Sequence, residues 1–122
     1  MDVRWPVIIF DDWLSPAVVP DVDKAYDYVE PSLYPNRRIS FDRSFAIVSF
    51  EASAGEQGFL PRLRDGVPEP ARFRQVARVS YRLHGPRAVW RRGRLWRSDQ
   101  TDTRGLDADQ LWAALAELFT VE

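Results

Sequence analysis

The segment VWRRGRLWR, residues 89–97, is the densest group of side chains in the chain that could bind an anion. The planar guanidinium of arginine matches phosphate, and exposed aromatic rings stack on the bases of single strands. This composition suits a nucleic-acid-binding hairpin, whereas the pI of about 5.8 and the usual place of tryptophan in a core favour an ordinary hairpin with a charged outer face. The candidate nucleic-acid-binding residues are Arg91, Arg92, Arg94 and Arg97, interleaved with Trp90 and Trp96.

A second group of candidate binding residues is acidic. In DVDKAYDYVEP, residues 21–31, three carboxylates recur at intervals of four and three, which places them on one side of a helix. Two adjacent aspartates follow the first apolar run of the chain. The alternatives are a solvated helix face and an ordinary turn. The candidate partner-binding residues are Asp11, Asp12, Asp23, Asp27 and Glu30.

Catalytic and metal-binding patterns are not found in the sequence. His84 is the only histidine, there is no cysteine, and neither a G-x-S-x-G nor an H-E-x-x-H motif occurs. The aspartates of SDQTDTRGLDADQ do not have the spacing of a calcium loop, and the glycines of SAGEQG do not form a phosphate-binding loop. We therefore expect a protein that is not an enzyme and that needs no metal or cofactor.

Composition indicates a globular protein with a strongly segregated charge. The chain has 122 residues, of which 45% are hydrophobic, and its longest apolar run near the amino terminus is too short for a signal peptide or a membrane span. With no cysteine, the cytoplasm is the expected compartment. Residues 62–104 carry twelve arginines against four acids, and Lys24 is the only lysine in the chain. This arginine excess suits anion binding, and it is also what a GC-rich genome encodes at any position that needs a positive charge.

The first half of the chain predicts two strand regions around a helix. WPVIIF is a continuous apolar run of the kind found in a central, buried strand. Residues 21–31 predict a helix that Asp21 caps and Pro31 ends. RRISFDRSFAIVSFEA predicts a β-hairpin with a tight turn at residues 42–44.

The second half predicts a loop, strands and a final helix. SAGEQGFLPRLRDGVPEP, rich in glycine and proline, predicts an ordered loop. In FRQVARVSYRLHG, Pro70 could open a helix and Gly85 could close one, but strict alternation from Ala77 to His84 favours a strand. Residues 87–98 predict a hairpin with its tip at 91–93, where a bulge at Arg92 and Gly93 turns both tryptophans inward.

The last segment, LDADQLWAALAELF, carries the signature of a capped helix. Asp107 is the expected N-cap and Gln110 its capping-box partner. The apolar face is expected to comprise Leu111, Leu115, Leu118 and Phe119. Together these elements predict a single α+β domain spanning residues 1–122, with an antiparallel sheet of about five strands and two helices packed on one face.

The first half of the chain also resembles a protein family. The features are the apolar strand VIIF, the motif YVEP at residues 28–31 and the pair FD at 41–42, with a leucine-rich helix at 111–119. In these features the chain resembles small, largely uncharacterised actinobacterial proteins that are similar to immunity proteins of polymorphic toxin systems. The resemblance implies a stoichiometric, cytoplasmic binding protein that neutralises a cognate toxin by occluding it. The acidic residues would complement a basic cleft on that partner. The competing interpretation is a nucleic-acid-associated or regulatory module that uses the hairpin 89–97.

Overall fold

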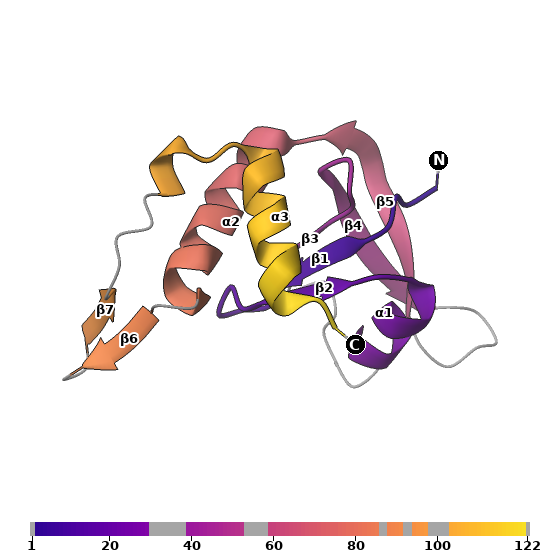
Figure 1. The fold of residues 1–122 in the computed structure, drawn as a ribbon. Helices are drawn as coiled ribbons and strands as arrows, with labels where there is room; N and C mark the ends of the chain where they lie inside the picture. Colours follow the sequence, from indigo (N-terminus) through magenta and orange to yellow (C-terminus); the bar gives the residue numbers. More distant parts are fainter. Residues whose placement is uncertain are drawn as a thin grey trace.

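A five-stranded antiparallel sheet forms the centre of the protein in a computed structural model (Figure 1). The structure describes residues 2–29, 39–52, 59–85, 88–91, 94–97 and 103–121. The strands are β1 (Val7–Phe10), β2 (Pro16–Val19), β3 (Ile39–Phe41), β4 (Ala46–Ala52) and β5 (Phe59–Pro68). Their order across the sheet is β2-β1-β3-β4-β5, and every neighbouring pair is antiparallel. The predicted α+β fold class is confirmed.

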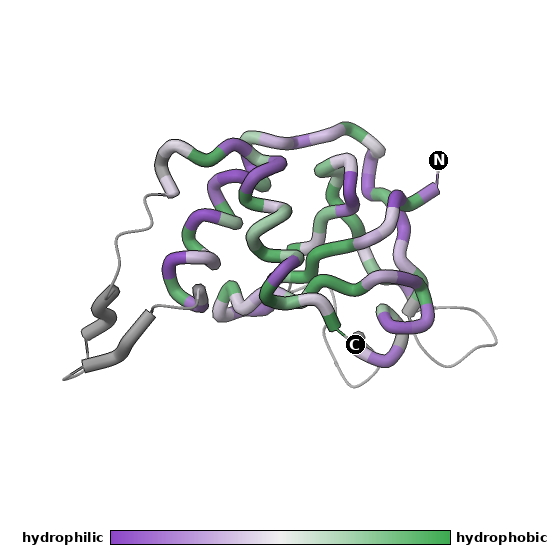
Figure 2. Tube along the Cα trace, viewed as in Figure 1, coloured by the Kyte–Doolittle hydropathy of each residue, from purple (hydrophilic) through white to green (hydrophobic). Residues whose placement is uncertain are grey.

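Helices cover both faces of this sheet. They are α1 (Val22–Val29), α2 (Pro70–His84) and α3 (Ala108–Phe119), with a short 3₁₀ turn, η2, at Thr103–Gly105. On one face, Phe10 and Phe41 of the sheet meet Phe73 of α2 and Leu111 of α3. On the other face, alternate residues of the same strands pack with Ala25 of α1. Figure 2 shows hydrophobic residues gathered in these central strands.

Two helices do share one face of the sheet, as predicted, but they are not the two predicted helices. The sequence predicted only the helices at 21–31 and 107–119, which correspond to α1 and α3 and lie on opposite faces. The helix that packs beside α3 is α2.

The prediction of a strand in FRQVARVSYRLHG is wrong, because this segment belongs to α2. Phe73, Ala77 and Ser80 are buried at intervals of four and three, so the helical period decides which face meets the core. Val79, which a strand would have buried with Ala77, is 43% exposed. Pro70 lies in the first turn, and the Gly85 N–H donates to the Tyr81 carbonyl at 2.8 Å, which closes the helix.

The prediction of a loop at residues 53–70 is also wrong, because most of its described part is β5. Pro61 and Gly66 are tolerated there because β5 is an edge strand, where one side of the backbone pairs with no neighbour. A register shift between Ala46 and Val48 of β4, with Gly66 at a φ of 74°, lets the strand continue. Strand β2 was not predicted as a strand at all.

Three local predictions are confirmed. Strand β1 is a fully buried interior strand, and β3 and β4 form a hairpin. The Asp107 carboxylate accepts the Gln110 N–H at 2.8 Å while the Gln110 side chain accepts the Asp107 N–H at 2.9 Å, so the capping box of α3 is complete. On the same helix Leu118 is 45% exposed, and Trp112 takes a place in the core instead.

Strands β6 (Ala88–Arg91) and β7 (Arg94–Arg97) form a separate two-stranded hairpin beside α2 (Figure 1). The register pairs Val89 with Trp96 and Trp90 with Leu95. Positions 90 and 96 therefore fall on opposite faces of the hairpin. The predicted bulge lies at Arg92 and Gly93, outside the described residues. The expectation that both tryptophans share one face is wrong, because the register is regular on both sides of that link.

Candidate protein-docking site

The structure divides the predicted acidic residues between two places. Asp11 and Asp12 lie in the turn between β1 and β2, whereas Asp23 and Asp27 lie on α1. Strand β2 connects the two, and its four residues span about 13 Å at the usual rise of a strand. Glu30 lies outside the described residues. The two described groups therefore lie before and after β2 in the fold.

Two turns of the sheet share one hydrogen-bonding pattern, and we call them the first Asp turn (residues 11–15) and the second Asp turn (residues 42–46). In the first, Asp11 Oδ1 accepts the Trp13 N–H at 2.9 Å and the Ser15 N–H at 2.8 Å. Its backbone also accepts the Leu14 N–H at 2.9 Å and donates to the Ser15 carbonyl at 3.1 Å. Leu14 has a φ of 57°. The aspartate thus fixes the path of the whole turn.

The second Asp turn repeats this pattern residue for residue. Asp42 Oδ1 accepts the N–H groups of Ser44 and Ala46 at 2.9 and 3.1 Å, and the Asp42 backbone bonds to Phe45 and Ala46, both at 2.9 Å. Phe45 has a φ of 67°. In both turns the fourth residue takes a left-handed conformation that favours glycine, and its apolar side chain packs against the core.

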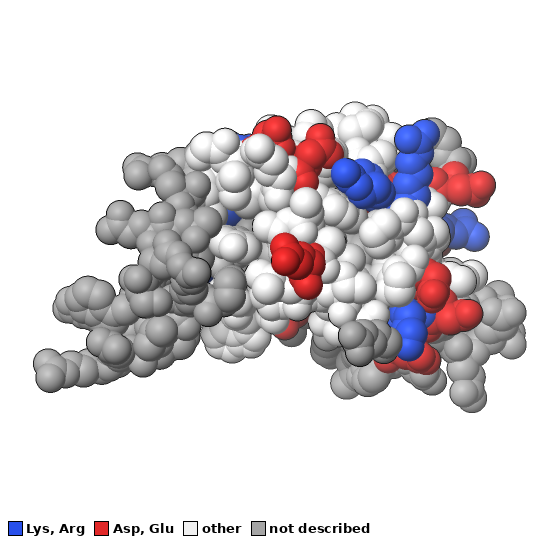
Figure 3. Space-filling view, viewed as in Figure 1, with Lys and Arg blue, Asp and Glu red and all other residues white. Residues whose placement is uncertain are grey.

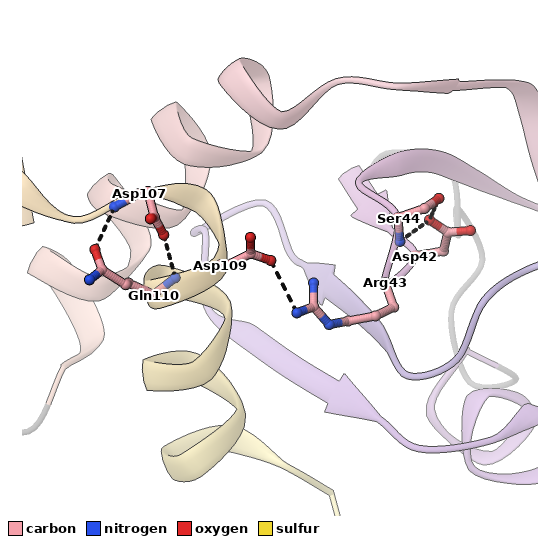
Figure 4. A network of polar contacts seen from close by, with 6 residues as sticks. All are labelled: Asp42, Arg43, Ser44, Asp107, Asp109 and Gln110. Atoms are coloured by element: carbon pink, nitrogen blue, oxygen red, sulfur yellow. Dashed lines mark hydrogen bonds and ion pairs between the residues drawn. The ribbon is translucent and has the colours of Figure 1, made fainter.

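The two turns differ at their third residue. In the second Asp turn this residue is Ser44, whose hydroxyl donates to Asp42 Oδ1 at 2.6 Å and so completes the turn (Figure 4). In the first Asp turn it is Trp13, whose surface is 80% exposed. The hydrogen bonds of the turn require only the backbone of this residue, so the turn itself does not explain a tryptophan.

His84, the last residue of α2, contacts the backbone of the first Asp turn. Its Nε2 lies 2.9 Å from the Trp13 carbonyl oxygen, which can only accept, so Nε2 carries the hydrogen. The only histidine of the chain is therefore engaged with the backbone of the turn. Together, Asp11 and His84 hold the Trp13 backbone while its side chain is left to solvent.

The second Asp turn is tied into the body of the protein. Asp42 is fully buried, and its Oδ2 also accepts the Arg4 N–H at 3.1 Å. The Arg43 guanidinium lies 3.1 Å from Asp109 on α3 (Figure 4). It also lies 5.0 Å from the centre of the Trp112 ring. A hollow of about 400 Å³ lies beside this turn, lined by Asp2, Val3, Arg4, Asp42, Ser44, Leu63, Gly66 and Pro68. Because four protein donors already occupy the Asp42 carboxylate, we assign it a structural role.

The side chains of the candidate nucleic-acid-binding arginines are not described by the structure. For Arg91, Arg94 and Arg97 the structure describes the backbone alone, and Arg92 lies outside the described residues. Within the described part of the chain, no group of three or more acidic or histidine side chains could hold a metal ion.

Sequence reasoning missed Trp13. The signal that could have identified it is the repeat of F-D-x-x-Φ, where Φ is a large apolar residue, at 10–14 and 41–45. The third position after phenylalanine holds tryptophan in one copy and serine in the other.

Comparison with known proteins adds no assignment. The chain matches no family model, no curated protein and no solved structure. Among the described residues, no helix is both long and apolar enough to cross a bilayer.

Proposed function

We propose that this protein is a cytoplasmic, non-enzymatic binding protein that neutralises a protein partner by occluding it, in the manner of an immunity protein. The observation that carries the proposal is the solvent-exposed Trp13 on the hydrogen-bonded first Asp turn. The resemblance of the first half of the chain to immunity proteins points the same way.

Trp13 has the properties of an interface anchor. Tryptophan is among the residues most enriched at the energetic centres of protein interfaces, where it fills a pocket on the partner. Among the residues whose side-chain exposure the structure describes, Trp13 is the most exposed large hydrophobic one. Apolar surface left in water adds nothing to the stability of the isolated protein. A partner pocket would remove that surface from water.

The fixed backbone of the turn lowers the cost of binding. Ordering a loop at an interface costs free energy, and a loop that is already ordered avoids that cost. Here the hydrogen bonds from Asp11 and His84 fix the Trp13 backbone before any partner arrives.

The charge beside the anchor indicates a basic partner surface. Asp11 is committed to the backbone of the turn, but the adjacent Asp12 is exposed and has no hydrogen bond or ion pair among the described residues. An exposed charge at the rim of an interface mainly accelerates association. Figure 3 shows acidic and basic side chains interspersed over the face that it draws, so the charge of this face as a whole does not select a partner.

The gene neighbourhood supplies the test, because an immunity gene normally lies directly downstream of the gene for its toxin. The product of the reading frame directly upstream should be toxic when expressed alone, and co-expression of this chain should restore growth. The purified pair should form a complex of fixed stoichiometry. A toxic upstream product that neither binds this chain nor is neutralised by it would overturn the proposal.

A further inference from the structure

A second candidate binding surface lies on α2, in an unusually basic stretch of the sequence. Residues 70–97 contain nine arginines and not one aspartate or glutamate. The structure folds this stretch into a helix and an adjacent two-stranded hairpin. The first Asp turn adjoins α2 at His84, whose Nε2 contacts the Trp13 carbonyl oxygen.

The four arginines of α2 have different surroundings. Arg74 is part of the fold, since its Nε donates to the Leu106 carbonyl at 2.8 Å. Arg72 lies 3.9 Å from Glu69. Arg78 and Arg82 take part in no ion pair or hydrogen bond within the described part of the chain, and the Nε of Arg78 is buried without a partner.

Arg78 and Arg82 also place two positive charges close together on α2. They are four residues apart, so they lie one turn apart on the same side of α2, where like charges repel each other and weaken the helix. An anion held between the two side chains would relieve this repulsion.

We propose that the side of α2 carrying Arg78 and Arg82 binds the phosphate backbone of a nucleic acid, with the hairpin β6–β7 beside it. Arginine binds both carboxylate and phosphate, so charge alone does not choose between them. The hairpin favours nucleic acid, because a two-stranded antiparallel ribbon is one of the two elements that the major groove of DNA admits. The hairpin pairs with no strand of the main sheet and extends past the end of α2 in Figure 1.

The test measures binding of the intact chain to a fluorescein-labelled mixed-sequence DNA duplex and to labelled oligo(dT) by fluorescence anisotropy. The wild-type affinity for at least one of these probes should fall by about tenfold or more between 50 and 200 mM salt, as expected when several phosphates are neutralised. The double variant Arg78→Gln/Arg82→Gln should bind that probe about tenfold more weakly at low salt, with a shallower dependence on salt.

The matched control is Arg62→Gln/Arg64→Gln, which removes the same charge from exposed positions on β5. The control should bind almost as the wild type does, because the binding surface lies on α2. Equal losses in the two double variants would mean that only the net charge matters and would overturn the proposal. If the α2 double variant is less stable by thermal melting, the single variant Arg82→Gln at an exposed position replaces it and should still bind more weakly than Arg64→Gln.

Two further outcomes would reject the assignment. The first is that neither probe binds at low salt. The second is that poly-glutamate competes as well as unlabelled DNA for the same surface, which would make the ligand an acidic protein. Both outcomes leave the neutralisation of the upstream product unaffected, so the two proposals fail separately.

Discussion

The two Asp turns have the same backbone and different surroundings. Each begins with an aspartate after a buried phenylalanine, closes with the same four kinds of hydrogen bond, and places an apolar residue in a left-handed conformation at its fourth position. The second turn begins and ends with buried residues and is bonded to the amino-terminal segment and to α3, whereas the first turn presents a tryptophan to solvent. The comparison teaches that the aspartate specifies the shape of the turn, and that the third residue is free to serve something else.

The largest effect is expected from Asp42→Ala. The substitution leaves the N–H groups of Arg4, Ser44 and Ala46 without their acceptor at a buried site, so the free energy of unfolding should fall by about 3 kcal/mol or more. Denaturant unfolding measures the loss. Asp42→Asn keeps one acceptor oxygen and should lose less. A loss below about 1 kcal/mol in the alanine variant would show that Asp42 does not hold its turn.

Asp11→Ala should have a smaller effect on stability. The first Asp turn is more open to water, so water can accept some of the hydrogen bonds that the carboxylate accepts in the wild type. We therefore expect the free energy of unfolding to fall by about 1 to 2 kcal/mol. The released turn should also bind the partner more weakly, through faster dissociation. Denaturation and surface plasmon resonance measure the two effects. If stability falls and dissociation does not change, the order of the turn is irrelevant to binding.

Arg43→Ala should cost about 0.5 to 1 kcal/mol, mostly through the lost contact with the Trp112 ring. The ion pair with Asp109 is exposed on both sides, so it should add little. A double-mutant cycle with Asp109→Ala separates the two contributions. A coupling energy above about 1 kcal/mol would show that this surface ion pair holds the second turn to α3.

Trp13→Ser places in the first Asp turn the residue type that the second one has. Because the tryptophan side chain is mostly in solvent and the turn uses only its backbone, the free energy of unfolding should change by no more than about 0.5 kcal/mol. Thermal and denaturant unfolding check this. A loss comparable to that of a buried tryptophan would mean that Trp13 supports the fold.

The sequence was a good guide where one residue determines local geometry. The capping box of α3 follows from Asp107 and Gln110, and the β3–β4 turn follows from Asp42. The sequence was a poor guide where tertiary packing determines which residues are buried. In α2 the apolar residues alternate as they would in a strand, at Ala77, Val79, Tyr81 and Leu83. The residues of this helix that are buried in the core are instead Phe73, Ala77 and Ser80. Strand β5 contains the glycine and proline residues of a loop because it lies at an edge.

The candidate site was only partly predictable for a similar reason. Asp11 and Asp12 were singled out by their charge, yet the structure gives Asp11 a role in the turn and leaves Trp13 as the exposed group. The F-D-x-x-Φ repeat marks the position of the turn in the sequence. The exposure of the Trp13 side chain depends in addition on how the folded elements meet around it. Asp11 precedes β2 and Asp23 follows it, so the spacing of the two groups depends on this strand, which the sequence did not predict.

The central claim is that Trp13 serves a partner and not the fold. The direct measurement is the Kd of the complex with the upstream product, for the wild type and for Trp13→Ser, beside Val67→Ser as a control at another exposed apolar residue. We expect Trp13→Ser to weaken binding by about 30-fold or more, the level of an interface hot spot, at unchanged stability. Val67→Ser should bind as the wild type does. A Trp13→Ser variant that folds normally and binds with wild-type affinity would contradict the claim.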